Sequence, residues 1–570
     1  MKQILLFSNT NNLIKISLCA VLFMSGSYLS AQEWNWAASH SSAGADEAPY
    51  VATSPSGDVY IVQTYEGAAT VGSDNYPAAE EDGRDLLVAK YDADGVYQWS
   101  NTVNSLGGGN NLFASDWPSG IKADDSGVYV IGSHGSTSDF FGESRENYEF
   151  FIAKLSSDGD LVWDVSTEDV GIIHQYKQIE FSSADRLLVS GIYETVGDEV
   201  VIGGQSIGDG GFLLEVNTST GEVLRAADEI PFRIDQLVAY TDDLTAVSSY
   251  YEGAHHVGMV NLSTGLLEWS YETTDLTNDP RSRSLGMFVN DSDEIEYVFK
   301  AGTSDDLDFG NGMIIDGGNN DHGLLMRLDG DGNALYTSRL FDQFQQPQNF
   351  QDTVAIFQRP FTPRKAIKDS EGGFYLTGTL IGPRTLANGL VLTTDEGFNA
   401  TSAKDAIVMR LDSDFTISEF ASHTGTAVQD GYDIASSLNG DVVMAGIHTA
   451  SMFGPVTFNT AFGETELPLT NDGLFDVFVT RLSTGEITNE DDPNSVSEFD
   501  STMKAQAFPN PSSNGTFQFS RKLKGITVHN QTGQMVFESH DLIEKLDLSG
   551  LESAIYFASS ENQHFKLIIE

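Results

Sequence analysis

Cysteine, basic residues and long apolar segments are all scarce in this chain of 570 residues. The one cysteine, Cys19, lies in an N-terminal segment that we expect to be removed, which leaves no disulfide, thiol nucleophile or thiolate metal ligand. Lys and Arg number 30 against 83 Asp and Glu, for a formal net charge of -53. So acidic a chain lacks the basic surface that nucleic acid requires, and anionic lipid headgroups repel it. No segment after the N-terminus reaches eighteen apolar residues, so we expect no membrane span in the mature chain.

Recognisable catalytic and cofactor motifs are missing as well. The sequence has no His-Glu-x-x-His, no Gly-x-Ser-x-Gly and no phosphate-cradling glycine loop. Asp-x-Asp-Gly occurs at 92–95 and 329–332 without the further oxygen ligands of a calcium loop, which favours plain turns and leaves calcium binding open. The adjacent His255 and His256 would point to opposite faces of a strand and not to one metal. We therefore predict no catalytic residue, no metal site and no cofactor.

Residues 1–31 have the pattern of a secretory signal peptide. Lys15 precedes the apolar run Ile16–Met24, and small residues then lead to a cleavage point before Gln32. Leu18, directly before Cys19, is too bulky for a lipoprotein-type cleavage. The pattern predicts a protein that is secreted or displayed on the outer cell surface.

Residues 32–487 repeat one pattern seven times. A β-rich segment that follows a turn is succeeded, after a connection of variable length, by an apolar segment with a basic or polar residue near its end. The first segment begins at 58, 127, 186, 244, 296, 373 and 441, and the second at 86, 150, 212, 257, 324, 406 and 477. Each copy adds an earlier strand and a later one, and several of the later strands end in an aromatic residue: Trp99, Trp163, Trp269 and Tyr336. Four antiparallel strands repeated in this way predict an all-β, seven-bladed β-propeller.

The two ends of the repeat region complement each other. The seventh copy lacks an aromatic last strand, whereas the segment after the signal begins Glu33-Trp34-Asn35-Trp36 and looks like an isolated last strand. We therefore expect Glu33–His40 to complete the seventh blade and to leave no open sheet edge there. The copies resemble the SBBP-type bacterial propeller repeat, whose motifs are structural and not catalytic.

A different unit follows an acidic linker at 488–505. Turn residues separate its alternating strands, which predicts a small β-sandwich at 506–570. Its motifs closely resemble the type A C-terminal sorting domain of the type IX secretion system of Bacteroidota, although Ala554 stands where that family usually has Gly. The matching residues that we select as the sorting motif are Phe508, Pro509, Asn510, Pro511, Gly533, Leu551, Tyr556 and Lys566. The resemblance implies binding to the type IX machinery, passage through the outer membrane, and removal of this domain with release or surface attachment.

The long connections of the propeller region should gather on one face of the disc. The turns between the first and second strands and between the third and fourth are short, whereas the other connections are mostly long, with a short one between the second and third strands of the fourth blade. Long connections in a compact fold tend to carry function. Aromatic residues on these connections are candidates for ligand contact, unless they only pin the loops: Trp117, Phe141, Tyr148, Phe309, Phe398 and Phe453.

Three functions stay open on these residues. The leading hypothesis is a non-catalytic module that binds a polysaccharide or a surface protein through the long-connection face. The second is an extracellular polysaccharide lyase or hydrolase with a carboxylate site on that face, because propellers host both binding and catalysis. The third is a structural matrix protein.

Overall fold

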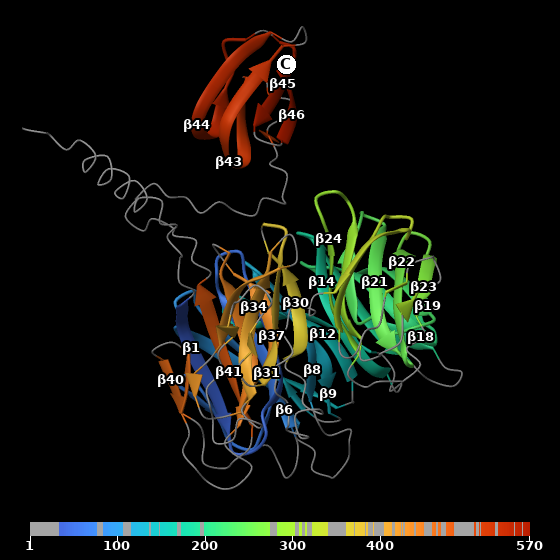
Figure 1. Cartoon of the computed structure of the whole chain (residues 1–570), viewed down its shortest axis with the longest axis vertical. Helices are drawn as coiled ribbons and strands as arrows, with labels where there is room; N and C mark the ends of the chain where they lie inside the picture. Colours follow the sequence, from blue (N-terminus) through green and yellow to red (C-terminus); the bar gives the residue numbers. More distant parts are fainter. Residues whose placement is uncertain are drawn as a thin grey trace, which may run out of the picture. The chain divides into compact units, whose positions relative to one another are not determined.

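In the computed structural model (Figure 1), the chain divides into two compact units, Met1–Lys368 with Phe374–Ile487, and Thr488–Glu570 with Asp369–Gly373. The structure describes residues 33–76, 84–105, 116–135, 138–146, 149–167, 173–193, 199–273, 282–301, 307–309, 314–315, 322–339, 361–369, 371–381, 384–385, 391–392, 404–412, 416–422, 424–425, 428–437, 440–449, 459–462, 465–468, 475–483, 507–508, 512, 515–530, 534–551, 553–560 and 563–569. All the secondary-structure elements in these ranges are β-strands.

The first unit contains, in the described ranges, seven quartets of antiparallel strands, which we number as sheets 1 to 7. Sheets 1 to 3 are β2 (Glu47–Thr53), β3 (Val59–Glu66), β6 (Arg84–Tyr91) and β7 (Tyr97–Ser105); β8 (Trp117–Asp124), β9 (Gly127–His134), β12 (Glu149–Ser156) and β13 (Leu161–Ser166); and β14 (Ile173–Ser183), β15 (Arg186–Tyr193), β18 (Gly210–Asn217) and β19 (Val223–Ile230). Sheets 4 and 5 are β20 (Gln236–Ala239), β21 (Leu244–Tyr251), β22 (Ala254–Asn261) and β23 (Leu266–Glu272); and β24 (Arg283–Val289), β25 (Ile295–Ala301), β28 (His322–Leu328) and β29 (Ala334–Arg339).

Sheet 7 joins strands from the two ends of the repeat region, whereas sheet 6 is continuous in sequence. Sheets 6 and 7 are β30 (Phe361–Lys368), β31 (Phe374–Ile381), β34 (Lys404–Leu411) and β35 (Ile417–Ser422); and β37 (Val428–Ser436), β38 (Val442–Thr449), β41 (Phe475–Ser483) and β1 (Glu33–Ser42). β1 pairs antiparallel with β41 from Glu33 opposite Ser483 to His40 opposite Val477. The pairing expected for Glu33–His40 is therefore present.

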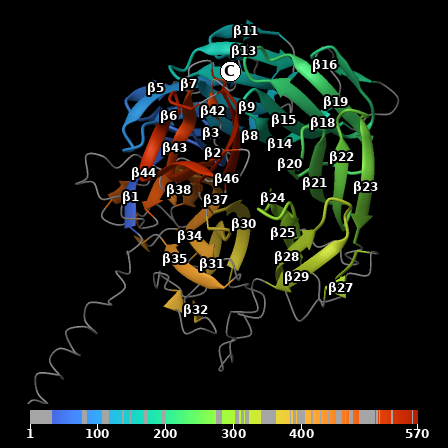
Figure 2. The same ribbon diagram turned by 90° about the horizontal axis from the view of Figure 1, so that it is seen from above.

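The first strands of the sheets form a ring. β2 contacts β8, and the contacts continue in chain order through β14, β20, β24, β30 and β37, which returns to β2. Figure 2 shows the sheets following one another around a common centre. Neighbouring sheets thus cover both faces of each middle strand, so that seven of the eight residues of β3 are buried. The outer strand β23 instead alternates between exposed and partly buried residues. This arrangement is propeller-like.

Each repeated tryptophan joins its sheet to the next one. Trp99 Nε1 and Lys90 Nζ of sheet 1 both donate to the carbonyl oxygen of Ser157 in sheet 2, at 2.9 and 3.1 Å. The same arrangement recurs twice: Trp163 and Lys154 donate to the carbonyl of Thr218, and Trp36 and Arg481 to that of Ala93. The recurring aromatic and basic residues of the sequence are therefore two parts of one contact between sheets.

Glycine is the third part of this contact. Gly159, in the turn between β12 and β13, has φ +90°, and a Cβ there would lie 2.8 Å from Trp99 Cδ2. A side chain would both strain the backbone and collide with the indole ring. Gly95 against Trp36, Gly221 against Trp163 and Gly332 against Trp269 repeat this packing.

Trp163→Ala should lower the free energy of unfolding by about 2–4 kcal/mol, because it removes a packed indole and leaves a cavity beside Gly221. Urea unfolding followed by circular dichroism measures this loss. Val162→Ala is the matched control on the same strand, because Val162 is exposed and should change stability by less than about 0.5 kcal/mol. Equal stability of the two variants would contradict the proposed role of Trp163.

Except in sheet 4, where two residues join β21 to β22, the connections between the second and third strands carry small hairpins. These hairpins are β4 (Ala69–Val71) with β5 (Asp74–Tyr76), β10 (Ser138–Phe140) with β11 (Glu143–Arg145), β16 (Val200–Ile202) with β17 (Gln205–Ile207), β26 (Leu307–Asp308) with β27 (Ile314–Ile315), β32 (Arg384–Thr385) with β33 (Val391–Leu392), and β39 (Asn459–Phe462) with β40 (Thr465–Pro468). Three of them pair with the outer end of the preceding sheet: β4 with β1, β10 with β7, and β39 with β36 (Thr424–Gly425), which follows β35. These connections thus help to hold neighbouring sheets together.

The second unit is a separate β-structure. β42 (Ala507–Phe508), β43 (Thr516–His529), β45 (Ile555–Ser560) and β46 (Gln563–Ile568) lie in this order, and β44 (Met535–Asp547) also pairs with β43. Its core contains Phe517, Ile526, Leu546, Tyr556 and Leu567, all buried.

Candidate functional site at the central cavity

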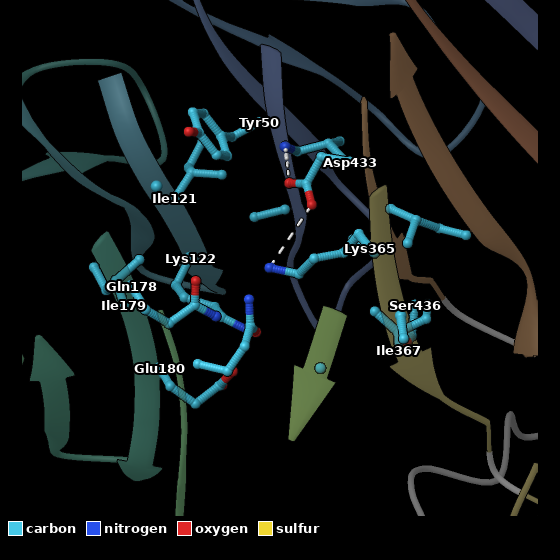
Figure 3. A pocket seen from close by; sticks show the side chains of 18 of the residues that line it. Tyr50, Ile121, Lys122, Gln178, Ile179, Glu180, Lys365, Ile367, Asp433 and Ser436 are labelled. Atoms are coloured by element: carbon cyan, nitrogen blue, oxygen red, sulfur yellow. Dashed lines mark hydrogen bonds and ion pairs between the residues drawn. The ribbon is translucent and has the colours of Figure 1, made fainter. Parts of the chain in front are cut away.

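A cavity of about 270 Å³ lies where the seven first strands meet (Figure 3). Every first strand contributes to its wall: residues 50–53 of β2, 120–123 of β8, 178–181 of β14, 236–237 of β20, 286–288 of β24, 365–367 of β30 and 433–436 of β37. The cavity forms only when all seven first strands come together, so the sequence pattern of any one sheet does not reveal it.

Two ion pairs provide the charges in the wall. Lys122 Nζ lies 2.7 Å from Glu180 Oε2, and Lys365 Nζ lies 3.9 Å from Asp433 Oδ1. Asp433 Oδ2 also accepts a hydrogen bond of 2.9 Å from the Val51 amide, as Figure 3 shows. Each of these two carboxylates thus lies beside a lysine of a neighbouring sheet.

Tyr50 adds a neutral hydroxyl to the wall. Burial raises the pKa of this phenol, and the nearby Asp433 and Tyr432 raise it further, because the charged phenolate would be desolvated beside a carboxylate. The hydroxyl therefore stays protonated at physiological pH.

A second group of charges lies just before the wall residues on β24, β30 and β37. Arg364 Nη2 lies 2.5 Å from Asp430 Oδ2, and the Arg364 guanidinium lies 4.8 Å from the centre of the Tyr432 ring. Thr379 Oγ1 donates to the other oxygen of Asp430. Burial by itself lowers the pKa of Arg364, but Asp430 outweighs it and raises the pKa overall.

Arg283 belongs to the same group. It is the first residue of β24 and is partly buried. Burial lowers the pKa of its guanidinium, and the like charge of Arg364 lowers it further, while Asp430 and Tyr432 act in the opposite direction. We call Arg283, Arg364, Asp430 and Tyr432 the rim; in sequence they precede the wall residues, on the side where the first strands enter from the long connections.

The aromatic candidates from the sequence divide into three groups. Phe141 and Phe309 are 6% and 1% exposed and pack in the cores of the sheets, because the hairpin connections bring them there. For these two residues, burial agrees with the alternative that the rings pin the long connections. Trp117 begins β8 and is partly buried, with the Arg84 guanidinium 4.9 Å from its ring centre. Tyr148, Phe398 and Phe453 lie outside the described residues.

Sequence reasoning missed the wall and rim residues. Their signal was present in first strands that carry charge amid apolar residues: Lys122, Arg364, Lys365, Asp430 and Asp433. Each strand has few such positions, and only the ring brings them together.

The acidic turns and the paired histidines have structural roles. Asp92 Oδ1 accepts from the amides of Asp94 and Val96, and Asp329 Oδ1 from those of Asp331 and Asn333, so both carboxylates stabilise their own turns. His255 is buried against Tyr297 at 3.1 Å, and His256 stacks on Phe232. The described part of the chain contains no group of three or more His, Cys, Asp or Glu residues placed to hold a metal ion. Nor does that part contain a helix that meets the length and hydropathy of a membrane span.

The sorting residues lie on several strands of the second unit. Phe508 is in β42, Tyr556 is buried in β45, Lys566 is in β46, and Leu551 precedes β45. Pro509, Asn510, Pro511 and Gly533 fall outside the described residues.

Comparisons with known proteins assign the second unit. Residues 506–570 match the family described as "Secretion system C-terminal sorting domain". This match confirms the type IX sorting domain and indicates export to the cell surface or the medium. The comparison with curated proteins found no match.

Solved structures resemble the larger part of the chain at low sequence identity. BamB from Moraxella catarrhalis is 11% identical, with TM-score 0.32, and the match covers 80% of this chain and 100% of that one. The Dos1 propeller is 12% identical, with TM-score 0.40 and coverage of 79% and 95%. Kuenenia stuttgartiensis hydrazine synthase is 9% identical, with TM-score 0.37 and coverage of 69% and 91%.

Proposed function

We propose that residues 32–487 form a seven-bladed β-propeller that binds a polysaccharide or a surface protein outside the cell, without catalysis. The seven quartets, the ring of first strands and the pairing of β1 with β41 support the blade count and the closure. In this proposal residues 1–31 are a signal peptide, 488–505 a linker, and 506–570 a β-sandwich that binds the type IX machinery and is removed on release or surface attachment.

The observation that carries the binding role is the neutralised cavity. Lys122 pairs with Glu180, and Lys365 lies close to Asp433, so the carboxylates in the described wall are compensated and well suited to hydrogen bonding. A preformed cavity with a few convergent polar groups is the usual form of a ligand site. We therefore place the ligand at the cavity and its rim, with Trp117 as a neighbouring aromatic contact.

A glycan array combined with reducing-sugar release on algal and bacterial polysaccharides tests this function. We expect binding without turnover. Gln178→Trp should abolish binding by filling the cavity, whereas Gln98→Trp, the same substitution at an exposed position of β7, should leave it unchanged. Release of sugar from any substrate would instead identify an enzyme, and equal binding by the two variants would place the ligand elsewhere.

A further inference from the structure

Arg283 has an exceptional environment in this acidic protein. Among the arginines whose side chains the structure describes, each of the others lies within 4.0 Å of a carboxylate: Arg84, Arg145, Arg186, Arg225, Arg233, Arg327, Arg364, Arg410 and Arg481. No hydrogen bond or ion pair joins the Arg283 guanidinium to another described residue. With 83 acidic and 30 basic residues in the chain, an arginine that forms no ion pair with a described carboxylate is unexpected.

The two carboxylates nearest to Arg283 among the described rim and wall residues already have other partners. Asp430 is held by Arg364 at 2.5 Å and by the Thr379 hydroxyl, and Asp433 is held by Lys365 and the Val51 amide. The described residues of β24, β30 and β37 at the rim and the adjoining wall thus include three positive side chains, Arg283, Arg364 and Lys365, and two carboxylates. The rim carries one uncompensated positive charge, although the whole chain carries -53.

We propose that the rim is a subsite for the carboxylate of an acidic sugar, with Arg283 as its principal partner. This inference rests on the proposed function and names the ligand class. A planar guanidinium matches the two oxygens of a carboxylate and donates two parallel hydrogen bonds. The adjacent Tyr432 ring and the protonated Tyr50 hydroxyl suit the apolar face and the hydroxyls of a sugar ring.

Size and charge favour a short or chain-terminal acidic saccharide. A cavity of about 270 Å³ accepts a sugar-sized group and not a folded protein. A long polyanion would bring many negative charges against an acidic surface and would be repelled. One terminal uronic acid brings a single negative charge, which the Arg283 guanidinium at the rim can compensate.

Calorimetric titration of the full-length protein with D-glucuronate and with D-glucose tests the charge directly, because the two sugars differ in the carboxylate. We expect glucuronate to bind about 10–100-fold more tightly than glucose, the range of one charge-assisted contact. Arg283→Gln should remove this preference, and Arg283→Lys should retain part of it. Arg145→Gln is the matched control, since it makes the same change in net charge at the outer hairpin and should leave binding unchanged. Equal affinity for the two sugars, or unchanged binding by Arg283→Gln with native circular dichroism, would overturn the proposal.

Further titrants distinguish other sources of the anion. Acetate as tight as glucuronate would overturn the role of the sugar ring, and tighter binding of a peptide C-terminal carboxylate would assign the rim to a protein ligand. Tighter binding of glucose 6-sulfate than of glucuronate would overturn the preference for carboxylate. Binding of neutral glycans that Gln178→Trp abolishes but Arg283→Gln does not would retain the proposed function and reject this subsite. If the protein bound glucuronate but no polysaccharide or protein ligand, the subsite would be retained and the proposed function would be rejected.

Discussion

Removal of Glu33–Ser42 should abolish cooperative folding of the first unit. This segment is β1, the outer strand of sheet 7, and it lies between β41 and the hairpin strand β4. Its loss exposes the edge of β41, removes the buried Trp36 from the turn at Gly95, and leaves Thr480 Oγ1 without the Trp36 carbonyl to which it donates at 2.7 Å. Loss of a packed tryptophan costs about 3–5 kcal/mol, and each lost ladder hydrogen bond about 1 kcal/mol. The sum is comparable to the whole stability of a typical domain, about 5–15 kcal/mol.

Thermal unfolding followed by near-ultraviolet circular dichroism measures this effect. We expect the truncated chain to show no cooperative transition, or a midpoint lowered by more than about 10 °C. Asn35→Ala, at an exposed position of β1, is the control and should unfold like the unaltered protein. A truncated chain with an unchanged midpoint would mean that β1 does not close the ring.

Stability should fall steeply as the pH drops from 7 to 5, because of buried histidines. Burial lowers the pKa of His40 to about 4, against the opposing effect of its Gln63 hydrogen bond, and burial with the neighbouring His256 lowers that of His255 to about 3. Both stay neutral in the folded state, whereas the unfolded chain protonates near pH 6.5. Their contribution is thus complete above pH 6.5 and is lost as the pH falls toward the folded pKa values. At pH 5 each histidine costs about 2 kcal/mol, and the pair about 4 kcal/mol.

Urea unfolding at pH 7, 6 and 5 measures this slope. His40→Gln should reduce the loss between pH 7 and 5 by about 2 kcal/mol, whatever its effect on stability at pH 7. In the folded protein, His40 Nδ1 bonds Gln63 and Nε2 bonds Tyr91, so the neutral ring satisfies both partners. His529→Gln, in the second unit, is the control and should leave the slope for the first unit unchanged. The same slope in His40→Gln as in the unaltered protein would exclude His40 as its cause.

The periodic features of the fold could be predicted from the sequence because each is local. Middle strands covered on both faces contain short continuous apolar segments, such as Val59–Val62, whereas outer strands alternate. The turn glycines, the basic residues and the tryptophans recur because the same contact between sheets is made at several places. Trp36 fits the series of recurring tryptophans in the outer strands, so the pairing of β1 with β41 could also be predicted from the sequence.

The candidate site could not be predicted in the same way. Aromatic residues on long connections were compatible with ligand contact and with pinning of the loops, and hairpins in those connections fold Phe141 and Phe309 into the cores. The length of a connection does not reveal whether it pairs with the neighbouring sheet. The charges of the cavity are isolated in sequence, since Lys122 and Glu180, or Arg364 and Asp430, come from different strands.

The amino-acid sequence by itself determined the strands, their seven-fold repetition, the export route and the contact that joins the sheets, because these depend on spacing along the chain. Only the tertiary structure decided where charge is compensated. Whether an arginine forms an ion pair depends on side chains that the ring brings together from distant strands, and for Arg283 no described carboxylate forms one.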